Sequence, residues 1–472
     1  MSMAPTRPRE RIIRRPIVHP EKVVVKYSNN RARHPVREPL ILALGFLATI
    51  LIGSLLLTLP AANREGVVTP YIVALFTSTS AVCVTGLVVV DTETYWTPFG
   101  QAVIVGLIQV GGLGWMTAST FLLAAVGRRV GLADRLLLRA AHGVAPLGGV
   151  LRLTQRVVLV TAIIEGVGAL ILFLRFAQDF SLAKALWMGV FHSVSAFNNA
   201  GFDIIGGFKS LTPYNQEPVV LPTIAFLIIL GGISYTVLLN VGHQRAFRYL
   251  LLDTKLVLLT TGFLLAAGTV GLLIMEYANQ STLGPMDIPA KLLNAFFSST
   301  TPRTAGFNSI DVGRMTQGGI FLTIALMFIG AASGSTGGGI KVNTFAVLVA
   351  VAIASVKGRE SVTAFGRRLP PSEVNRAFSV ALLAFGLIFG VTLVLTAIEP
   401  FTLPQLLFET TSAFGTVGLS TGITPNLSLV GKLLIITTMY LGRVGPLTAA
   451  LALLQRGKPE TCKYPAAEVK IG

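Results

Sequence analysis

The sequence predicts an all-α membrane protein made of four consecutive repeats with parallel topology. The chain of 472 residues is 52% hydrophobic and only 12% charged, whereas about 25% of the residues in soluble proteins are charged. Nearly continuous apolar segments of about 20 residues, enough to cross about 30 Å of hydrocarbon as helix, recur along the chain. A short motif also occurs four times at similar spacing, which indicates an internal repeat.

The repeated motif is a phenylalanine followed ten residues later by a glycine, with serine and threonine between them. The copies read FTSTSAVCVTG at 76–86, FHSVSAFNNAG at 191–201, FFSSTTPRTAG at 296–306 and FETTSAFGTVG at 408–418. Each copy is too short to span a bilayer. A single glycine in a membrane loop is usually a packing residue, but four at matched positions in diverged repeats indicate a shared function.

The distribution of charge predicts the orientation in the membrane. The formal net charge is +17, and lysine and arginine concentrate in both termini and in the alternate segments 127–156, 243–255 and 357–376. This positive-inside pattern predicts a multi-pass membrane protein with both termini in the cytoplasm. Nucleic-acid binding is disfavoured, because the basic residues are spread over loops. The two cysteines are too few for a disulfide framework, and no cleavable signal peptide is visible.

Each repeat is predicted to contain a spanning helix, a half-membrane helix, a glycine loop and a second spanning helix. The boundaries are 1–38 for a basic N-terminal tail, 39–127, 154–243, 255–357 and 375–455 for repeats one to four, and 456–472 for a C-terminal tail. Second spans are expected at 99–126, 219–241, from 318 onward and at 428–454. Eight transmembrane helices and four re-entrant half-helices then surround one pore with pseudo-four-fold symmetry.

The repeated loop has the chemistry of a cation site. Each half-helix starts at the outer face, so its C-terminal end, which carries partial negative charge, points to the middle of the membrane. Irregular backbone is tolerated there only where protein buries it or where it lines a water-filled cavity. A ring of loop carbonyls can replace the hydration shell of an ion. Inverted repeats would indicate a transporter of another type, but the charge pattern contains no inversion.

Six strings carry a resemblance to a known family. They are VTGLVVVDT at 84–92, QVGGLGWMT at 109–117, SAFNNAGF at 195–202, TPRTAGFNS at 301–309, SAFGTVGLS at 412–420 and GRVGPLT at 442–448. In this order they resemble the Trk/Ktr/HKT superfamily of potassium transporters, from about Pro39 to the C-terminus. No extra helix pair precedes the first repeat, so the chain is most similar to the membrane subunits of bacterial Ktr systems.

The resemblance implies a potassium-selective filter made by the four loops. Some members carry serine at the first filter glycine and favour sodium, whereas this chain carries Gly86. Potassium is expected to bind backbone carbonyls near Thr85, Ala200, Ala305 and Val417. The implied filter residues are Val84, Thr85, Gly86, Asn199, Ala200, Gly201, Thr304, Ala305, Gly306, Thr416, Val417 and Gly418.

A glycine run interrupts the second span of repeat three at 331–341. Each glycine in a helix interior costs about 1 kcal/mol relative to alanine, so a regular helix is disfavoured. A packing kink is the plain alternative, and a nucleotide P-loop fails because Ile340 occupies its lysine position. The resemblance implies an intramembrane gating loop that includes Gly334, Ser335, Thr336, Gly337, Gly338, Gly339 and Lys341.

Several charged residues do not fit the loop pattern. Arg443 lies inside the last span, where a cation is expensive and usually functional; the resemblance implies that it faces the gating loop as a barrier to cations. Lys341 is expected to snorkel to the cytoplasmic surface. Arg303 is expected to point away from the ion path and brace its loop against an acid.

The roles of the acidic residues can be interpreted as structural or as functional. We expect Glu165 to pair with His192, and Glu409 to have a structural partner. Asp91, Asp203 and Asp311 follow filter glycines and either concentrate cations at the pore mouth or are solvated loop charges. A proton-coupled transporter that uses Glu165 remains an alternative function. An enzyme is not expected, since the five histidines form no cluster with a nucleophile or metal set.

The remaining expectations concern ligands and partners. No cofactor is expected on this chain, potassium is the transported ion, and sodium is open as an activator. The resemblance implies a homodimer controlled by a cytosolic ring of RCK-type subunits that bind ATP or ADP. Membrane lipid is the other expected contact.

Overall fold

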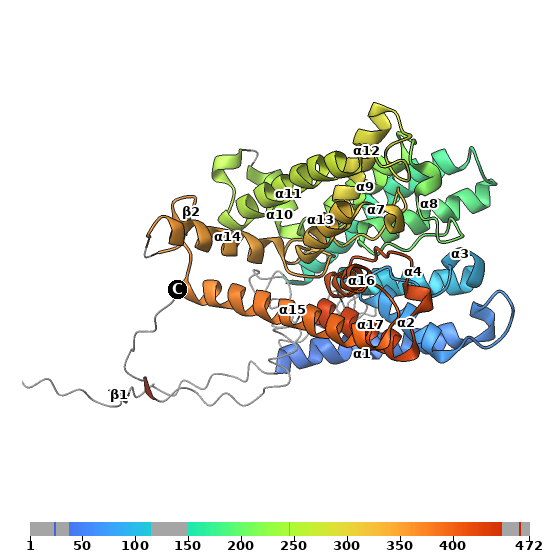
Figure 1. The fold of residues 1–472 in the computed structure, drawn as a ribbon, viewed down its shortest axis with the longest axis horizontal. Coiled ribbons are helices and arrows are strands. Elements are labelled where there is room, and N and C mark those ends of the chain that lie inside the picture. The colour runs from blue at the N-terminus through green and yellow to red at the C-terminus, as the bar shows by residue number, and fades with distance from the viewer. Residues whose placement is uncertain are drawn as a thin grey trace, which may run out of the picture.

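The computed structural model describes residues 23–24, 37–114, 150–244, 246–359, 361–445 and 462–463. This part of the chain is almost entirely helical, and several of its long helices run along the horizontal axis of Figure 1. Most of the two predicted tails lies outside the described residues, as do 115–126 and 446–454, the predicted ends of two spans.

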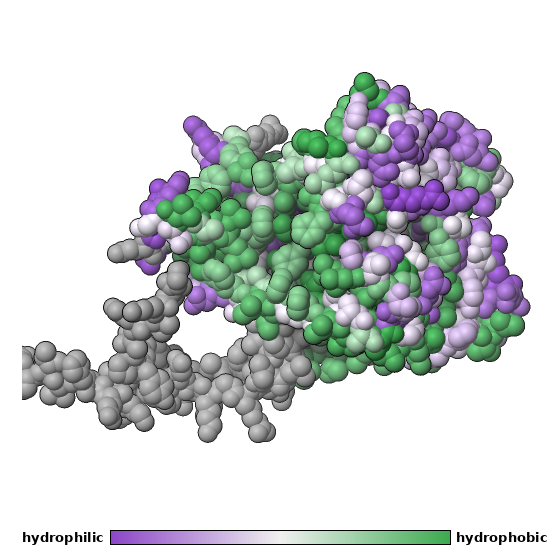
Figure 2. Space-filling view, in the orientation of Figure 1, coloured by the Kyte–Doolittle hydropathy of each residue, from purple (hydrophilic) through white to green (hydrophobic). Residues whose placement is uncertain are grey.

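Within the described residues, four helices are long and apolar enough to cross a membrane. They are α1 (Arg37–Thr58), α7 (Val150–Phe176), α11 (Leu252–Glu276) and α15 (Pro371–Ile398). The mean hydropathy of their apolar segments lies between 2.2 and 2.7, and at most 33% of each segment is buried inside the protein. The remaining side chains are available to lipid, so the chain is an integral membrane protein. Figure 2 shows the corresponding surface, largely hydrophobic in the middle with hydrophilic residues gathered toward its ends.

A short helix follows each long one. These helices are α2 (Tyr71–Val82), α8 (Leu182–Phe197), α12 (Ile288–Thr300) and α16 (Leu403–Gly415). Their C-terminal halves, which hold the hydroxyl-rich motifs, are buried. Asp287 caps the start of α12, and Thr402 with Gln405 forms a capping box at the start of α16.

Three of the short helices are attached to their long helices by the same device. A serine hydroxyl on the short helix donates to a carbonyl of the long helix, three residues before a glycine that leaves room for it. The pairs are Ser78 with Ile50, Ser193 with Glu165 and Ser299 with Leu265, at 2.7, 2.6 and 2.8 Å. The clustered hydroxyls are therefore partly structural.

A third set of helices returns from the glycine loops. It comprises α4 (Pro98–Leu113), α9 (Val220–Gly232), α13 (Gln317–Phe328) and α17 (Leu429–Val444). Acids at the ends of two long helices support the starts of α13 and α17. Glu276 Oε1 accepts from Thr316 N at 2.8 Å, and Glu399 Oε1 accepts from Ser428 N at 3.0 Å. A carboxylate at a helix N-terminus is favourable because that end carries partial positive charge.

The predicted second spans are not continuous helices. The stretch predicted as one span at 219–241 is bent rather than straight, because α9 ends at Gly232 and α10 (Tyr235–Gln244) leaves it at 94°. In repeat three, α13 ends at Phe328 and α14 (Val342–Val356) begins after a loop, as the glycine run predicted. Helices α4 and α17 end before Gly114 and Gly445, whose φ angles are +80° and +91°. Such backbone is open mainly to glycine, which explains these two stops.

The remaining elements are small. Helix α3 spans Thr92–Tyr95, and the 3₁₀ turns η1 to η5 span Pro60–Ala62, Thr212–Tyr214, Phe247–Tyr249, Val312–Arg314 and Thr424–Asn426. Strands β2 (Thr363–Ala364) and β3 (Arg367–Arg368) form a hairpin after α14. Strand β1 (Val23–Val24) pairs antiparallel with β4 (Cys462–Lys463).

Candidate functional site: four glycine loops and the loop that contacts them

The four short helices end in loops with the same backbone signature. Two residues before each motif glycine, a non-glycine residue has positive φ; these residues are Val84, Asn199, Thr304 and Thr416, with φ between 50° and 73°. The glycines Gly86, Gly201, Gly306 and Gly418 have φ of 91°, 70°, 82° and 92°. Left-handed backbone at non-glycine residues is uncommon and is retained where the surroundings over-determine it. Its recurrence in all four loops indicates one shared geometry.

The four glycines form a closed ring of backbone contacts. A Cβ atom added to Gly86 would lie 2.4 Å from Ala200 O, and one on Gly201 would lie 2.6 Å from Ala305 O. The ring continues from Gly306 to Val417 O at 2.5 Å, and closes from Gly418 to Thr85 O at 2.1 Å. The clashing atom is always a backbone carbonyl oxygen of the next loop, which no side-chain rotation can move. Only glycine fits at these four positions.

Hydroxyl groups of the short helices hold two of the glycines in place. The N–H of Gly86 donates to Ser80 Oγ at 3.0 Å, and that of Gly418 donates to Ser412 Oγ at 3.1 Å. In the second loop, Ser195 Oγ instead donates to Phe202 O at 2.7 Å. In three of the four loops the hydroxyl six residues before the glycine thus bonds the loop backbone, which gives these serines a specific role.

A second set of glycines, which the sequence analysis missed, packs against the ends of the short helices. Added Cβ atoms on Gly111, Gly231 and Gly442 would lie 2.1, 1.7 and 2.0 Å from the carbonyl oxygens of Val82, Phe197 and Phe414. Those three carbonyls belong to residues four before a ring glycine. The signal in the sequence is a short string that ends α4, α9 and α17: GGLG at 111–114, GGIS at 231–234 and GRVG at 442–445.

The loop between α13 and α14 packs directly against three of the four glycine loops. Thr336 Oγ1 donates to Phe197 O at 3.3 Å and contacts Asn199 Oδ1 at 3.2 Å. Added Cβ atoms on Gly337 and Gly338 would lie 2.2 and 2.1 Å from the Oγ1 atoms of Thr304 and Thr416. The glycines of the run therefore permit close approach to the ring, and the simpler explanation of a kink in a helix does not apply.

Arg443 fastens this loop to the first repeat. Its guanidinium donates to Thr336 O and to Gly111 O, and it lies over the Phe46 ring at 5.9 Å from the centroid. This contact between Arg443 and the loop agrees with the prediction. The expectation that Lys341 reaches the cytoplasmic surface is wrong, because its Nζ donates at 2.5 Å to Gly337 O within the same loop. Two cationic groups thus hold carbonyls beside the ring.

A cavity lies beside the same loop. It has a volume of about 150 Å³, and its lining includes Gly112, Gly231, Gly334, Thr336 and Arg443. The end of α4, the break between α9 and α10 and the loop after α13 meet at this cavity. Any movement of the loop would therefore change the shape of a space adjacent to the ring.

The predicted pair of Glu165 and His192 is wrong. Glu165 accepts from Asn198 Nδ2 at 2.8 Å and from Gln109 Nε2 at 3.3 Å. His192 instead contacts Met188 O through Nδ1 at 2.8 Å and lies among aromatic rings, including those of Phe176 and Phe191. Amide donors satisfy a buried carboxyl more fully than one imidazole would. Because Asn198 begins the second glycine loop, Glu165 positions that loop.

Glu409 and Arg303, the other buried charges that the sequence singled out, differ in their partners. Glu409 accepts from Ser420 Oγ at 3.0 Å and from Thr424 Oγ1, as expected for a structural acid. Arg303 is 6% exposed. No ion pair found among the described residues includes Arg303, so the expected acid partner is not there.

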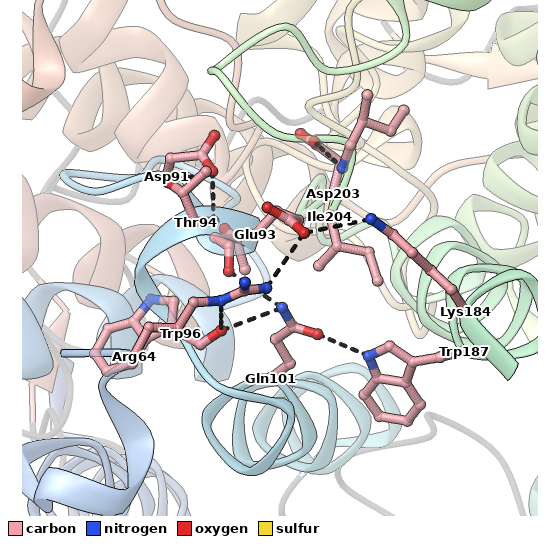
Figure 3. A network of polar contacts seen from close by, with 12 residues as sticks. Arg64, Asp91, Glu93, Thr94, Trp96, Gln101, Lys184, Trp187, Asp203 and Ile204 are labelled. Carbon is pink, nitrogen blue, oxygen red and sulfur yellow. Dashed lines mark hydrogen bonds and ion pairs between the residues drawn. The ribbon is translucent and has the colours of Figure 1, made fainter. Parts of the chain in front are cut away.

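The acids after the glycine loops are not equivalent. Asp91 caps α3 and also accepts from Phe208 N at 2.8 Å, while Asp311 pairs with Arg314 at 3.2 Å. Burial, with the carboxylate of Asp91 nearby, raises the pKa of Asp203 to about 6. Figure 3 shows Asp203 and Asp91 beside a polar network in which Glu93 pairs with Arg64 at 3.2 Å and Lys184 at 3.5 Å. This network joins the loop of repeat one to α8.

Comparisons with known proteins agree with the helical membrane fold. Residues 39–458 match the family model described as TrkH, cation transport protein. The chain is 42% identical to Ktr system potassium uptake protein B of Bacillus subtilis, over 92% of this chain and 96% of that protein. It is 38% identical to potassium/sodium uptake protein NtpJ of Enterococcus hirae, over 94% and 99%. The crystal structure of the potassium transporter TrkH from Vibrio parahaemolyticus is similar with a TM-score of 0.71 at 16% identity, covering 92% of this chain and 87% of that one.

Proposed function

We propose that this chain, which belongs to the TrkH family of cation transport proteins, is the potassium-translocating membrane subunit of a Ktr-type uptake system. The observation that carries the proposal is the closed ring of Gly86, Gly201, Gly306 and Gly418, whose neighbours are backbone carbonyls. The family is one of transport proteins rather than enzymes. Relatives named for potassium uptake support potassium as the ion.

The proposed filter uses backbone oxygens to replace the water around potassium. The carbonyls next to the ring glycines belong to Thr85, Ala200, Ala305 and Val417. Such a ring removes the hydration shell without placing a formal charge in the path. The C-terminal ends of α2, α8, α12 and α16 precede the four loops, and their partial negative charge favours a cation there.

The proposed topology has eight spans, in four repeats around this ring, with both termini in the cytoplasm of a bacterial plasma membrane. Ions enter from the outer side and leave past the loop at 331–341. The membrane potential drives this flux with about 2.3 kcal/mol per charge per 100 mV. The order of long helix, short helix, loop and returning helix, which occurs four times, supports the arrangement.

The proposed gate is the loop at 331–341, held beneath the filter by Arg443. Its contacts with Asn199, Thr304 and Thr416 reach three filter loops at once, so its displacement would open the path. A regulatory ring of RCK-type subunits with ATP or ADP is the proposed partner that moves it, acting on a homodimer of this chain. Sodium as an activator is part of the same proposal.

Rubidium uptake tests the proposed ion selectivity. Cells that lack their own potassium uptake and express this chain with its regulatory subunit should accumulate rubidium in the presence of a large excess of sodium. A variant that should leave this uptake and its selectivity unchanged is Gly386→Ala, since a Cβ at that position meets nothing within 4 Å. Equal competition by sodium and potassium would contradict a potassium filter and favour the broader substrate range that the name potassium/sodium uptake protein gives to one relative.

Replacing Glu165 with glutamine distinguishes a structural role from proton coupling. Glutamine keeps an acceptor oxygen for Asn198 but has no titratable proton, so we expect uptake to stay within about fivefold of wild type at pH 6 and pH 8, since one hydrogen bond contributes about 1 kcal/mol. Glu165→Ala removes the acceptor of Gln109 Nε2 and one of three acceptors of Asn198 Nδ2, and should lower thermal stability. If Glu165→Gln abolished a pH-dependent component of uptake while the protein remained folded, the proton-coupled alternative would be favoured.

A further inference from the structure

An apolar groove lies away from the glycine ring, between α11, α14 and the β2–β3 hairpin. Its volume is about 520 Å³, within the range of about 300–1,000 Å³ typical of small-molecule sites. Phe263 from α11, Val349 and Ile353 from α14, and Phe365 from the hairpin line it, and all four are exposed by 40–66%. Figures 1 and 2 show α11 and α14 side by side beneath a largely hydrophobic surface.

One end of this groove is cationic. Arg359 lines it, and its Nη1 donates at 3.5 Å to Thr363 Oγ1. Lys255 lies at the same end, with its Nζ at 5.8 Å from the centroid of the Phe365 ring. Arg248 is next to it, because Lys255 Nζ donates to Arg248 O at 2.8 Å. The ion pairs of the described residues include none of these three cations.

The cationic end lies at the depth of lipid headgroups. Lys255 is in the first turn of α11 and Arg359 follows the last turn of α14, so both are at membrane-helix ends on the side where basic residues concentrate. Leu256 to Phe263 then extend the groove by about 10 Å into the hydrocarbon region. A ligand that fits must be apolar along its length and anionic at one end.

We propose that the groove binds an anionic phospholipid of the cytoplasmic leaflet. An acyl chain lies along Phe263, Val349 and Ile353, and the phosphate meets Lys255 and Arg359. Charged hydrogen bonds from Arg to phosphate are strong and geometrically specific, and basic residues near this leaflet attract anionic lipid. A second copy of the chain docked here across a two-fold axis would bring two basic clusters toward one interface, which disfavours it.

The lipid is placed to influence the loop beside the ring. Helix α14 starts directly after that loop, and Asn343 in its first turn accepts from Ser333 N at 3.1 Å while donating to Asp253 at the start of α11. An acyl chain between α11 and α14 therefore sets the spacing of the two helices to which the loop is attached. This consequence for transport rests on the function proposed above, whereas lipid binding does not.

Native mass spectrometry of the full chain tests binding directly. After delipidation, the protein is titrated with phosphatidylglycerol and with phosphatidylcholine of identical acyl chains. We expect phosphatidylglycerol to bind more tightly, and the double variant Lys255→Gln, Arg359→Gln to weaken its binding about tenfold or more, since each basic residue near the surface contributes about 1 kcal/mol. Ala350→Phe, which fills the groove, should also weaken binding.

The matched control removes two charges from the β2–β3 hairpin beside the groove, on the same side of the membrane. Arg367→Gln with Arg368→Gln changes side chains that do not line the groove, so it should retain phosphatidylglycerol. Equal binding of the two lipids, or equal loss in the control, would overturn the site. Cross-linking of Ile353→Cys between two copies would overturn it in favour of a protein interface. Retained binding with lipid-independent rubidium uptake would support the site and overturn its link to the loop.

Discussion

Replacing Gly418 with serine is expected to lower uptake and to weaken the preference for potassium over sodium. A Cβ at this position would lie 2.1 Å from Thr85 O, and the φ of +92° is strained for any residue with a side chain. The overlap would displace the Thr85 carbonyl from the ring, and a loss of about 1.4 kcal/mol of ion binding is a factor of about ten. We therefore expect at least about a tenfold loss of potassium-selective rubidium uptake, measured with sodium as competitor.

Gly422→Ser is the matched control for this substitution. Gly422 lies four residues further along, and its φ is +91°, but a Cβ there would meet nothing within 4 Å. The two variants share the backbone strain and differ in the contact with the ring. If both variants reduced selectivity equally, or if Gly418→Ser left the ratio of potassium to sodium unchanged, the ring would not be the filter.

Deleting residues 334–339 is expected to raise basal flux without the regulatory partner. The deletion removes Thr336, which Arg443 holds, and the glycines that approach Thr304 and Thr416. Minor states of two-state proteins hold about 0.1–10% of the molecules, so removal of a dominant closed state should raise flux about tenfold or more. Rubidium uptake into proteoliposomes that contain only this chain measures the change.

A single substitution in the same loop provides the control for the deletion. Among the residues that the structure describes, Ser335 Oγ donates to Ala332 O alone, at 2.6 Å, so Ser335→Ala should leave basal flux unchanged. Arg443→Gln should reproduce part of the increase, because it removes a charge-assisted bond to Thr336. An unchanged flux after deletion, with the protein folded and inserted, would remove the loop from the gating mechanism.

The glycines of the ring could be predicted because the repeat makes them visible. A phenylalanine, a hydroxyl cluster and a glycine at the same spacing recur four times, and the reason for glycine, a close backbone approach with positive φ, applies to each copy alone. The contact between Arg443 and the glycine run was also predictable, but only through the resemblance. Gly111, Gly231 and Gly442 were missed, since each looks like an ordinary glycine in an apolar helix.

Other features could not be predicted because they depend on residues distant in the sequence. The bend between α9 and α10 lies in the apolar stretch 219–241, where hydropathy alone indicates one span. The loop after α13 shows what supports the bend: Ala332 N donates to Gly232 O at 3.0 Å and Thr336 N donates to Gly231 O at 3.3 Å. If the span were a straight helix, these carbonyls would instead accept from N–H groups of its next turn. The partners of Glu165, which are Gln109 on α4 and Asn198 directly after α8, were hidden for the same reason.

The sequence by itself determined the class of the protein, the order of its helices and the four positions where only glycine is possible. Hydrophobic length, alternate basic loops and the repeated motif are local properties, and they act independently of how the helices pack. The tertiary structure alone decided which carbonyl each glycine meets, where the returning helices break and which groups hold Arg443, Lys341 and Glu165. Those outcomes depend on shared space and on satisfying buried polar groups across elements, and a linear pattern does not encode either.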